Sequence, residues 1–129
     1  MKTKLLMGIL TMLCSLLGCN AQTDGFKSLS VEEYAKAIED TTVVRLDVRT
    51  AEEYADGHIE GTLNIDVLKS DFEKNVLATL PKDKTIAVNC RSGKRSKNAA
   101  RILVKIGFKV IELDSGYNGW VGDGKPIVK

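Results

Sequence analysis

The stretch TIAVNCRSGKRSKNAARILVKIG, residues 85–107, reads as a strand, a short loop and a helix in succession. Residues 85–89 are mostly apolar or β-branched and too few for a helix, which is typical of a buried strand. From Ser96 onward the apolar residues recur at helical spacing on one face, and Gly107 provides a stop. These apolar residues are Ala99, Ile102, Leu103 and Ile106. A strand that leads through a loop into a helix is the repeating unit of α/β folds.

The same alternation extends through the rest of the chain. The runs 43–48 and 110–113 are short, apolar and β-branched, and we interpret them as further buried strands. Ser30, Thr50 and Ser70 are each followed three residues later by Glu, the pattern of a capping box at a helix start. We therefore predict an α/β fold with a small parallel β-sheet and helices on both faces.

The first 18 residues predict export. A basic start with Lys2 and Lys4 precedes an apolar run at 5–17, which is too short to span a bilayer but fits a secretory signal. The run ends in Leu-Leu-Gly-Cys at 16–19, which resembles the bacterial lipobox, whose cysteine is lipidated and begins the mature chain. We expect an exported protein that is lipid-anchored through Cys19 at a bacterial membrane, facing the periplasm or the cell surface. The alternative is ordinary cleavage near residue 21 and a soluble periplasmic protein.

The predicted organisation is a signal peptide at 1–18, a tether at 19–25 and a single domain at 26–129. Removing 18 of the 129 residues leaves 111, enough for one small domain with its own core. Lys2 and Lys4 leave with the signal, so the mature chain has 17 basic and 17 acidic residues. Such a balance gives no general attraction to nucleic acid, and we predict no nucleic-acid partner.

Cysteine content singles out Cys90. Cys14 leaves with the signal and Cys19 is the lipidation candidate, so Cys90 is the remaining thiol. An unpaired thiol in an exported protein is either a buried inert residue or a reactive group. The loop after Cys90 favours the second interpretation, because Gly93 lets the backbone N–H groups turn inward at a helix N-terminus. Such donors hold an anion and favour the thiolate.

The charge of this loop supports a functional site. Helix N-termini prefer acidic residues, yet this one carries only cations, and locally broken rules often mark function. We assign Arg91, Lys94 and Arg95 to anion handling. The three cations at spacings of four, Lys97, Arg101 and Lys105, we interpret as a solvated helix face.

Three motifs resemble the rhodanese family. The segment CRSGKRS at 90–96 is similar to that family's active-site loop. LDVR at 46–49 with EEYADGHIEGTLNI at 52–65 resembles its amino-terminal signature, and GYNGW at 116–120 with GKP at 124–126 resembles its carboxyl-terminal one. Together the motifs extend over nearly all of residues 26–128, and Thr62 stands where the family often has Ala.

The resemblance implies a sulfurtransferase that works without a cofactor. Cys90 would take the outer sulfur of a donor such as thiosulfate as a persulfide and pass it to a thiol, to cyanide or to a redox-protein acceptor. The residues of the loop would bind the substrate. They are Arg91, Ser92, Gly93, Lys94, Arg95 and Ser96.

Other polar residues are interpreted as supporting the site. Asp47 and Arg49 suggest a buried ion pair beneath it. His58 is the sole histidine and invites a Cys–His hydrolase hypothesis, but in Gly-His-Ile it resembles a structural element of the family. With one cysteine and one histidine in the domain, we predict no metal site.

Two alternatives stay open. Rhodanese-fold phosphatases and arsenate reductases are relatives, but tyrosine-phosphatase-type loops place Arg six residues after the cysteine. Here that position is Ser96 and the last loop cation is Arg95, so the shorter loop suits one sulfur atom better than a tetrahedral oxyanion. From a different class, the domain could be a sulfur carrier without turnover, or a docking module.

Overall fold

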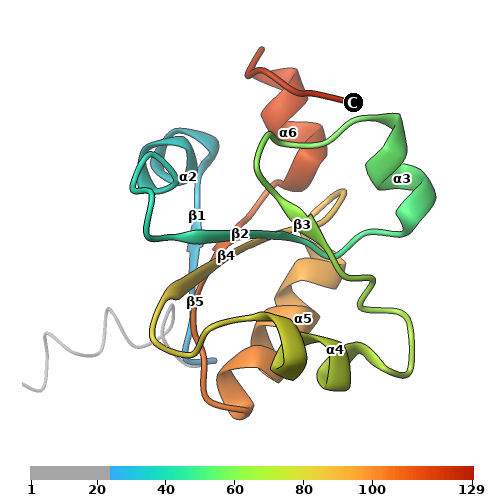
Figure 1. The fold of residues 1–129 in the computed structure, drawn as a ribbon. Coiled ribbons are helices and arrows are strands. Elements are labelled where there is room, and N and C mark those ends of the chain that lie inside the picture. Colours follow the sequence, from blue (N-terminus) through green and yellow to red (C-terminus); the bar gives the residue numbers. More distant parts are fainter. Residues whose placement is uncertain (1–23) are drawn as a thin grey trace, which may run out of the picture.

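The computed structural model describes residues 24–129, so the predicted signal, Cys19 and most of the tether lie outside the described residues. It contains one five-stranded sheet in the order β1-β5-β4-β2-β3, with every neighbouring pair parallel (Figure 1). The strands are β1 (Lys27–Leu29), β2 (Val44–Asp47), β3 (Leu63–Asn64), β4 (Thr85–Asn89) and β5 (Lys109–Leu113). The predicted small parallel sheet is confirmed.

Helices lie on both faces of this sheet, as predicted. The helices are α2 (Val31–Ala37), α3 (Ala51–Asp56), α4 (Phe72–Thr79), α5 (Lys94–Lys105) and α6 (Gly116–Gly122). Helices α2 and α6 lie on one side and α4 and α5 on the other, with α3 beyond β3 (Figure 1). Two separate cores result, one containing Phe72 and Leu103, the other containing Tyr34 and Trp120.

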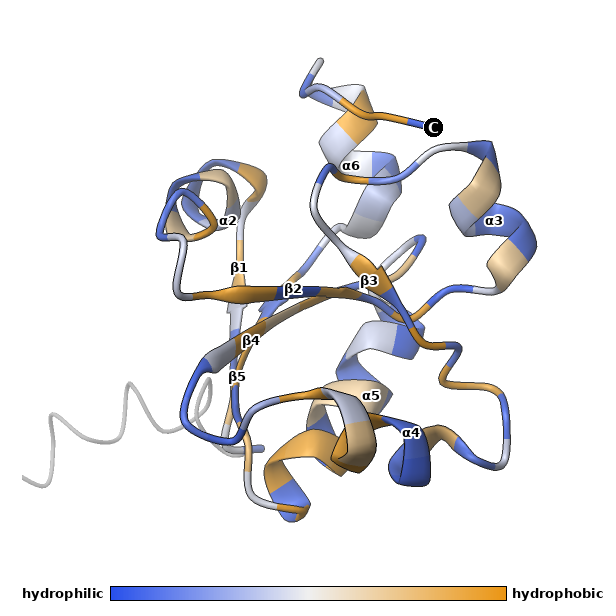
Figure 2. Ribbon diagram, viewed as in Figure 1, coloured by the Kyte–Doolittle hydropathy of each residue, from blue (hydrophilic) through white to orange (hydrophobic). Residues whose placement is uncertain are grey.

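Helix α5 shows most clearly how the sequence pattern becomes packing. Its first turns are hydrophilic and its later part is hydrophobic (Figure 2). Ala99, Ala100 and Leu103 are fully buried against the sheet. The helix begins at Lys94, two residues before the predicted start, because Gly93 at the N-cap has a left-handed conformation that turns the chain directly into the helix.

Capping boxes start two of the helices. Ser30 and Thr50 both accept the backbone N–H three residues on, and Glu33 and Glu53 bind back to the cap. The prediction at Ser70 was wrong, since α4 has Asp71 at its N-cap and no side-chain cap. A turn in which the Phe72 N–H donates to the Lys69 carbonyl shifts the start of that helix one residue onward.

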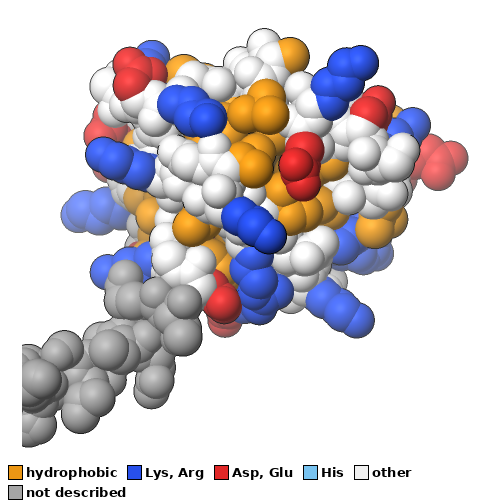
Figure 3. Space-filling view, turned by 90° about the horizontal axis from the view of Figure 1, so that it is seen from below, with side chains coloured by type: hydrophobic (Ala, Val, Ile, Leu, Met, Phe, Trp, Pro, Cys, Tyr) orange, Lys and Arg blue, Asp and Glu red, His pale blue; other side chains and the backbone are white. Residues whose placement is uncertain are grey.

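The molecular surface over α4 and α5 combines charged and hydrophobic side chains (Figure 3). Seen from below, Lys and Arg side chains lie around an apolar area instead of gathering in one patch (Figure 3). Leu77 on α4 and Leu68 before it are among the exposed large hydrophobic residues. Within residues 24–129, no helix is both long enough and apolar enough to cross a bilayer.

The parallel topology decides where a site can form. All five strands bring their carboxyl ends to one edge of the sheet, where α/β proteins bind ligands. Asp47, Asn64 and Asn89 are in register across that edge. Cys90 follows β4, the middle strand, and therefore lies at the centre of the edge.

Candidate active site

Cys90 lies between β4 and α5 with only 1% of its surface exposed. Its Sγ accepts a hydrogen bond from the Gly93 backbone N–H at 3.0 Å. The hydroxyl of Ser96 lies on another side of the sulfur, with 3.4 Å between Sγ and Oγ. A backbone donor at the start of a helix stabilises negative charge, so the surroundings suit an anionic sulfur.

Glycine is required at position 93. Its φ is +104°, and an added Cβ would lie 2.1 Å from the Asp114 carbonyl oxygen. Gly116 is under a similar constraint, because a Cβ there would lie 2.4 Å from the carbonyl oxygen of Arg91. The cysteine loop is therefore packed directly onto the turn between β5 and α6, with no space for a side chain at either contact.

Helix α6 holds the loop in this orientation. The Tyr117 N–H donates to the Cys90 carbonyl at 2.8 Å, and the Asn118 N–H donates to the Arg91 carbonyl at 3.0 Å. These are N–H groups of the first turn of α6, which have no partner within their own helix. They bind the loop carbonyls on the α6 side, and the Gly93 N–H remains directed at the sulfur.

The three loop cations differ in their surroundings. Arg95 is mostly buried and makes a two-pronged contact with Glu53, at 2.8 and 2.9 Å. Arg91 is 58% exposed and reaches the same carboxylate at 3.5 Å, and Lys94 is exposed. The hydrogen bonds from Arg95 hold the pKa of Glu53 well below its usual range, and the same contact raises the pKa of Arg95. Arg95 is thus an anchored cation, whereas Arg91 and Lys94 face solvent.

Asp47 and Arg49 form an ion pair buried beneath the site. Arg49 Nη2 lies 2.8 Å from Asp47 Oδ2, and the two side chains are 2% and 0% exposed. The guanidinium also donates to the Gly57 carbonyl and stacks 4.2 Å from the centre of the Tyr117 ring. Since Tyr117 binds the Cys90 carbonyl, the ion pair supports the cysteine loop from below.

A family model described as a rhodanese-like domain matches residues 30–123. This chain belongs to the rhodanese-like family. The strand, cysteine loop and helix described above lie inside the matched region.

Three relatives of this rhodanese-like domain are covered over more than nine tenths of their own length. YtwF of Bacillus subtilis is 36% identical over 101 residues, which cover 78% of this chain and 95% of YtwF. The thiosulfate sulfurtransferase GlpE of Shewanella oneidensis is 32% identical over 96 residues, 74% of this chain and 92% of GlpE. The crystal structure of a rhodanese-related protein from Thermoplasma volcanium aligns with a TM-score of 0.70 at 29% identity, over 78% of this chain and 96% of that one.

His58 of the rhodanese-like domain takes part in packing contacts. Its Nδ1 lies 2.8 Å from the Tyr54 carbonyl oxygen, and its ring stacks on that of Tyr54 at 3.7 Å. Its backbone pairs with Val128 in both directions at 2.9 Å. These contacts join α3 to the carboxyl-terminal segment, and none of the described hydrogen bonds of His58 reaches Cys90.

The sequence analysis misassigned Lys97 and did not single out Glu112, and the structure brings both next to the cysteine loop. Lys97 was assigned to a solvated face, and this was wrong: its Nζ lies 2.8 Å from Asp114 and 3.3 Å from Glu112. Glu112, on β5, is fully buried and also binds Ser96. The available signal was an acidic residue inside the predicted buried strand 110–113, a place where a carboxylate needs a partner.

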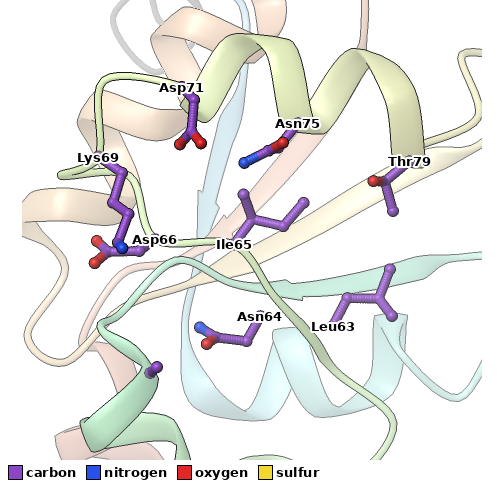
Figure 4. Close-up of a pocket in the computed structure, with 9 residues that line it drawn as sticks. Leu63, Asn64, Ile65, Asp66, Lys69, Asp71, Asn75 and Thr79 are labelled. Carbon is purple, nitrogen blue, oxygen red and sulfur yellow. The ribbon is translucent and has the colours of Figure 1, made fainter.

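A separate hollow of about 400 Å³ lies between β3 and α4 (Figure 4). Its walls are Ala51, Leu63, Asn64, Ile65, Asp66, Lys69, Asp71, Asn75 and Thr79. None of the loop residues 90–96 contributes to it. Our candidate for the chemistry is therefore Cys90, where the geometry supplies a sulfur nucleophile and an N–H donor.

Proposed function

We propose that this domain is a sulfurtransferase that carries sulfane sulfur on Cys90. The donor is thiosulfate or a persulfide, and the acceptor is a thiol or another nucleophile such as cyanide. Membership of the rhodanese-like family supports the proposal, as does the name of the relative GlpE, a thiosulfate sulfurtransferase. The observation that carries it is the contact between the Gly93 N–H and Cys90 Sγ in a buried loop at a helix start.

The reaction has two displacements at sulfur. The Cys90 thiolate attacks the outer sulfur of thiosulfate and forms a new S–S bond. The bond to the sulfonate sulfur breaks, and its electron pair leaves on sulfite. An acceptor thiolate then attacks the outer sulfur of the persulfide, and Cys90 departs as a thiolate. The acceptor gains the sulfur, and the enzyme returns to its starting state without a net oxidant or reductant.

Loop cations assist an anionic donor in this proposal. Arg91 and Lys94 are exposed and attract the dianion toward the mouth of the loop. Arg95 is held by Glu53, so it contributes to the field at the sulfur and keeps the loop in place. Burial of Cys90 favours a small terminal atom as the reacting group, since little of the sulfur is open to a bulky substrate.

A sulfur carrier is the second candidate. The 1% exposure of Cys90 suits a persulfide that is shielded until one fitted partner removes its sulfur. A carrier transfers sulfur only to that protein, whereas a sulfurtransferase also turns over with thiosulfate and a small acceptor. Steady-state assays with cyanide or a small thiol as acceptor separate the two.

The deciding experiment is mass spectrometry of the protein after incubation with thiosulfate. We expect a gain of one sulfur atom on the Cys90 peptide, removed by an added thiol. Cys90→Ser is the control, and it gains no sulfur because a serine hydroxyl forms no anion near neutral pH. Absence of the gain in the native protein, or turnover in Cys90→Ser, would overturn the proposal.

We also propose that the mature protein is exported and anchored to a bacterial membrane through lipid on Cys19. The support is the apolar run at 5–17 that ends in Gly18 and Cys19. Its acceptor is then a small thiol or a redox protein on the same side of the membrane.

A further inference from the structure

Glu112 is a buried carboxylate one hydrogen bond away from the neighbours of Cys90. Its side chain, on β5, is 0% exposed. Ser28 of β1 donates to Oε1 at 2.6 Å, while Ser96 of α5 donates to Oε2 at 2.5 Å. Lys97 Nζ lies 3.3 Å from Oε2. Burying a charge carries a desolvation cost even when the charge is paired. Packing alone therefore does not explain why a carboxylate stands at this position.

The hydroxyl of Ser96 connects Glu112 to the reacting sulfur. A hydroxyl has one proton, and three acceptors are within reach of Ser96 Oγ. They are Glu112 Oε2 at 2.5 Å, the Gly93 carbonyl oxygen at 3.1 Å and Cys90 Sγ at 3.4 Å. A carboxylate at the shortest distance is the strongest acceptor of the three. The proton therefore lies toward Glu112, and a lone pair of Ser96 faces the sulfur.

This orientation opposes negative charge on Cys90. A lone pair accepts the S–H proton of the thiol but repels a thiolate or the anionic end of a persulfide. The Gly93 N–H, 3.0 Å from Sγ, acts in the opposite sense. The sulfur thus lies between one donor that stabilises its anion and one hydroxyl whose proton is withheld by Glu112.

We propose that Glu112 is a positioning residue that sets the orientation of the Ser96 hydroxyl and thereby limits how readily the Cys90 sulfur carries negative charge. The benefit of Glu112 for catalysis rests on the sulfur transfer proposed above. A thiolate that is harder to form is also the better nucleophile. Without this restraint, the thiolate forms at lower pH and attacks more slowly.

The other titratable groups around this network keep their charge states in the range of the test. Tyr34 of α2 is fully buried, and burial raises its pKa, so it stays neutral. Desolvation opposes the charge on Lys97, but its contacts with Asp114 and Glu112 raise its pKa overall. Arg95 of α5 faces the sulfur and stays cationic because its contact with Glu53 raises its pKa. A pH-dependent change at Cys90 can therefore be assigned to the thiol itself.

The test is the pH dependence of alkylation by iodoacetamide, followed at the Cys90 peptide by mass spectrometry, in the full-length protein and in Glu112→Gln. The neutral amide cannot draw the Ser96 proton as a carboxylate does, so the hydroxyl turns toward the sulfur. We expect the midpoint of the profile to fall by about one pH unit. The plateau rate at high pH should fall about threefold, because the more easily formed thiolate is less nucleophilic. A variant that merely loosened the loop would expose Cys90 and raise the plateau rate.

Two further variants locate the effect. Ser28→Ala removes the hydrogen bond to Oε1 and leaves the contact with Ser96, so its midpoint should match the native protein. In a Ser96→Ala background, Glu112→Gln should move the midpoint by less than half as much. An unchanged midpoint in Glu112→Gln, or an equal shift with and without the Ser96 hydroxyl, would overturn the proposal.

Two features keep the test decisive. If Glu112→Gln does not fold, Glu112→Met supplies the same readout, since Lys97, the cation paired with Glu112, is partly exposed and keeps its contact with Asp114 at 2.8 Å, so that no buried charge is left unpaired. Alkylation needs no sulfur donor. Its outcome is therefore independent of whether the proposed sulfur transfer occurs.

Discussion

At the scale of single residues, the chemistry depends on how each polar group around one sulfur atom is already engaged. The Gly93 N–H is directed at Cys90 Sγ, and the Ser96 proton is directed away from it. Among the three loop cations, Arg95 is held by Glu53 at 2.8 Å, whereas Arg91 reaches that carboxylate only at 3.5 Å and, like Lys94, is exposed. Their roles follow from these partners more than from their distance to Cys90 in the sequence.

Arg91 is the cleaner probe of donor attraction, because removing Arg95 would also release Glu53. Arg91→Gln should lower the second-order rate with thiosulfate about tenfold at low salt, equivalent to about 1.4 kcal/mol in the barrier. The rate at which a neutral thiol removes sulfur from the Cys90 persulfide should fall by a smaller factor. Stopped-flow measurement of both half-reactions over a range of salt checks this, since screening weakens an interaction between exposed charges.

Lys105→Gln is the matched control for Arg91→Gln. It removes an exposed cation of the same sign from the last turn of α5, far from the loop. Its rate with thiosulfate should equal that of the native protein. Equal losses in the two variants would mean that net charge, and not the place of Arg91, is responsible.

At the scale of elements, the site is a junction in which α6, α3 and α5 each fasten the loop after β4. Helix α6 binds the loop carbonyls, and Glu53 of α3 holds Arg95 of α5. The close contact between Gly93 and the Asp114 carbonyl brings the loop against the end of β5. Variants at these contacts are expected to change stability and activity together.

Gly93→Ala should destabilise the fold by about 2–4 kcal/mol and abolish sulfur transfer. The native φ at this position is +104°, which a residue with a Cβ rarely adopts, and the added Cβ would lie 2.1 Å from a backbone oxygen. Gly122→Ala is the control, because in helix α6 its Cβ would meet nothing within 4 Å. That variant should be as stable as the native protein or more stable by up to about 1 kcal/mol. Urea unfolding of both proteins checks the prediction, and equal stability of the two variants would refute it.

The Glu53–Arg95 ion pair predicts a pH-dependent stability. The folded-state pKa of Glu53 lies below its ordinary value of 4.5, so its contribution is complete above about pH 4.5. It is lost as the pH falls from there through the lower folded pKa. Glu53→Gln, which can keep the capping box, should cost about 1 kcal/mol in the free energy of unfolding at pH 7.

That difference should shrink as the pH falls from about 5 to about 3, because the unfolded native chain then takes up a proton on Glu53. Urea unfolding of both proteins at each pH measures it. A difference that is the same at pH 7 and at about pH 3 would show that the ion pair does not link α3 to α5 as described.

At the scale of the whole molecule, one family model matches residues 30–123, and the relatives YtwF and GlpE are covered over nearly their whole length. The two cores on either side of the sheet leave the strand carboxyl ends as the place for chemistry. In our proposal, the segment before the domain directs its location. The motif at 16–19 therefore carries a prediction that is independent of the catalytic one.

We expect the mature protein, purified from bacterial membranes, to begin at an acylated Cys19. Intact-mass and peptide spectrometry measure the first residue and its modification. Cys19→Ser should release the protein from the membrane fraction or leave its signal uncleaved, since the acyl acceptor is lost. A native mature chain that begins at Gln22 without lipid would contradict the prediction.

The central elements could be predicted from the sequence because their signals are local. The runs 43–48 and 85–89 contain β2 and β4, the run 110–113 covers β5 except for Lys109, and the caps at Ser30 and Thr50 begin α2 and α3. The two edge strands are three and two residues long, too short for a periodic pattern. Helix α6 was missed because Gly116, Gly119 and Gly122 lower its helix propensity, and packing of Trp120 outweighs that cost.

By itself, the sequence determined the fold class, the family motifs and the position of Cys90 at a strand end, since these depend on residue type and spacing along the chain. Only the tertiary structure decided that Arg95 is paired with Glu53, 42 positions away, and that Ser96 donates to Glu112. The physical reason is that a side chain's charge and proton are directed by its partners in space. Those partners come from separate strands and helices, which only the folded sheet brings together.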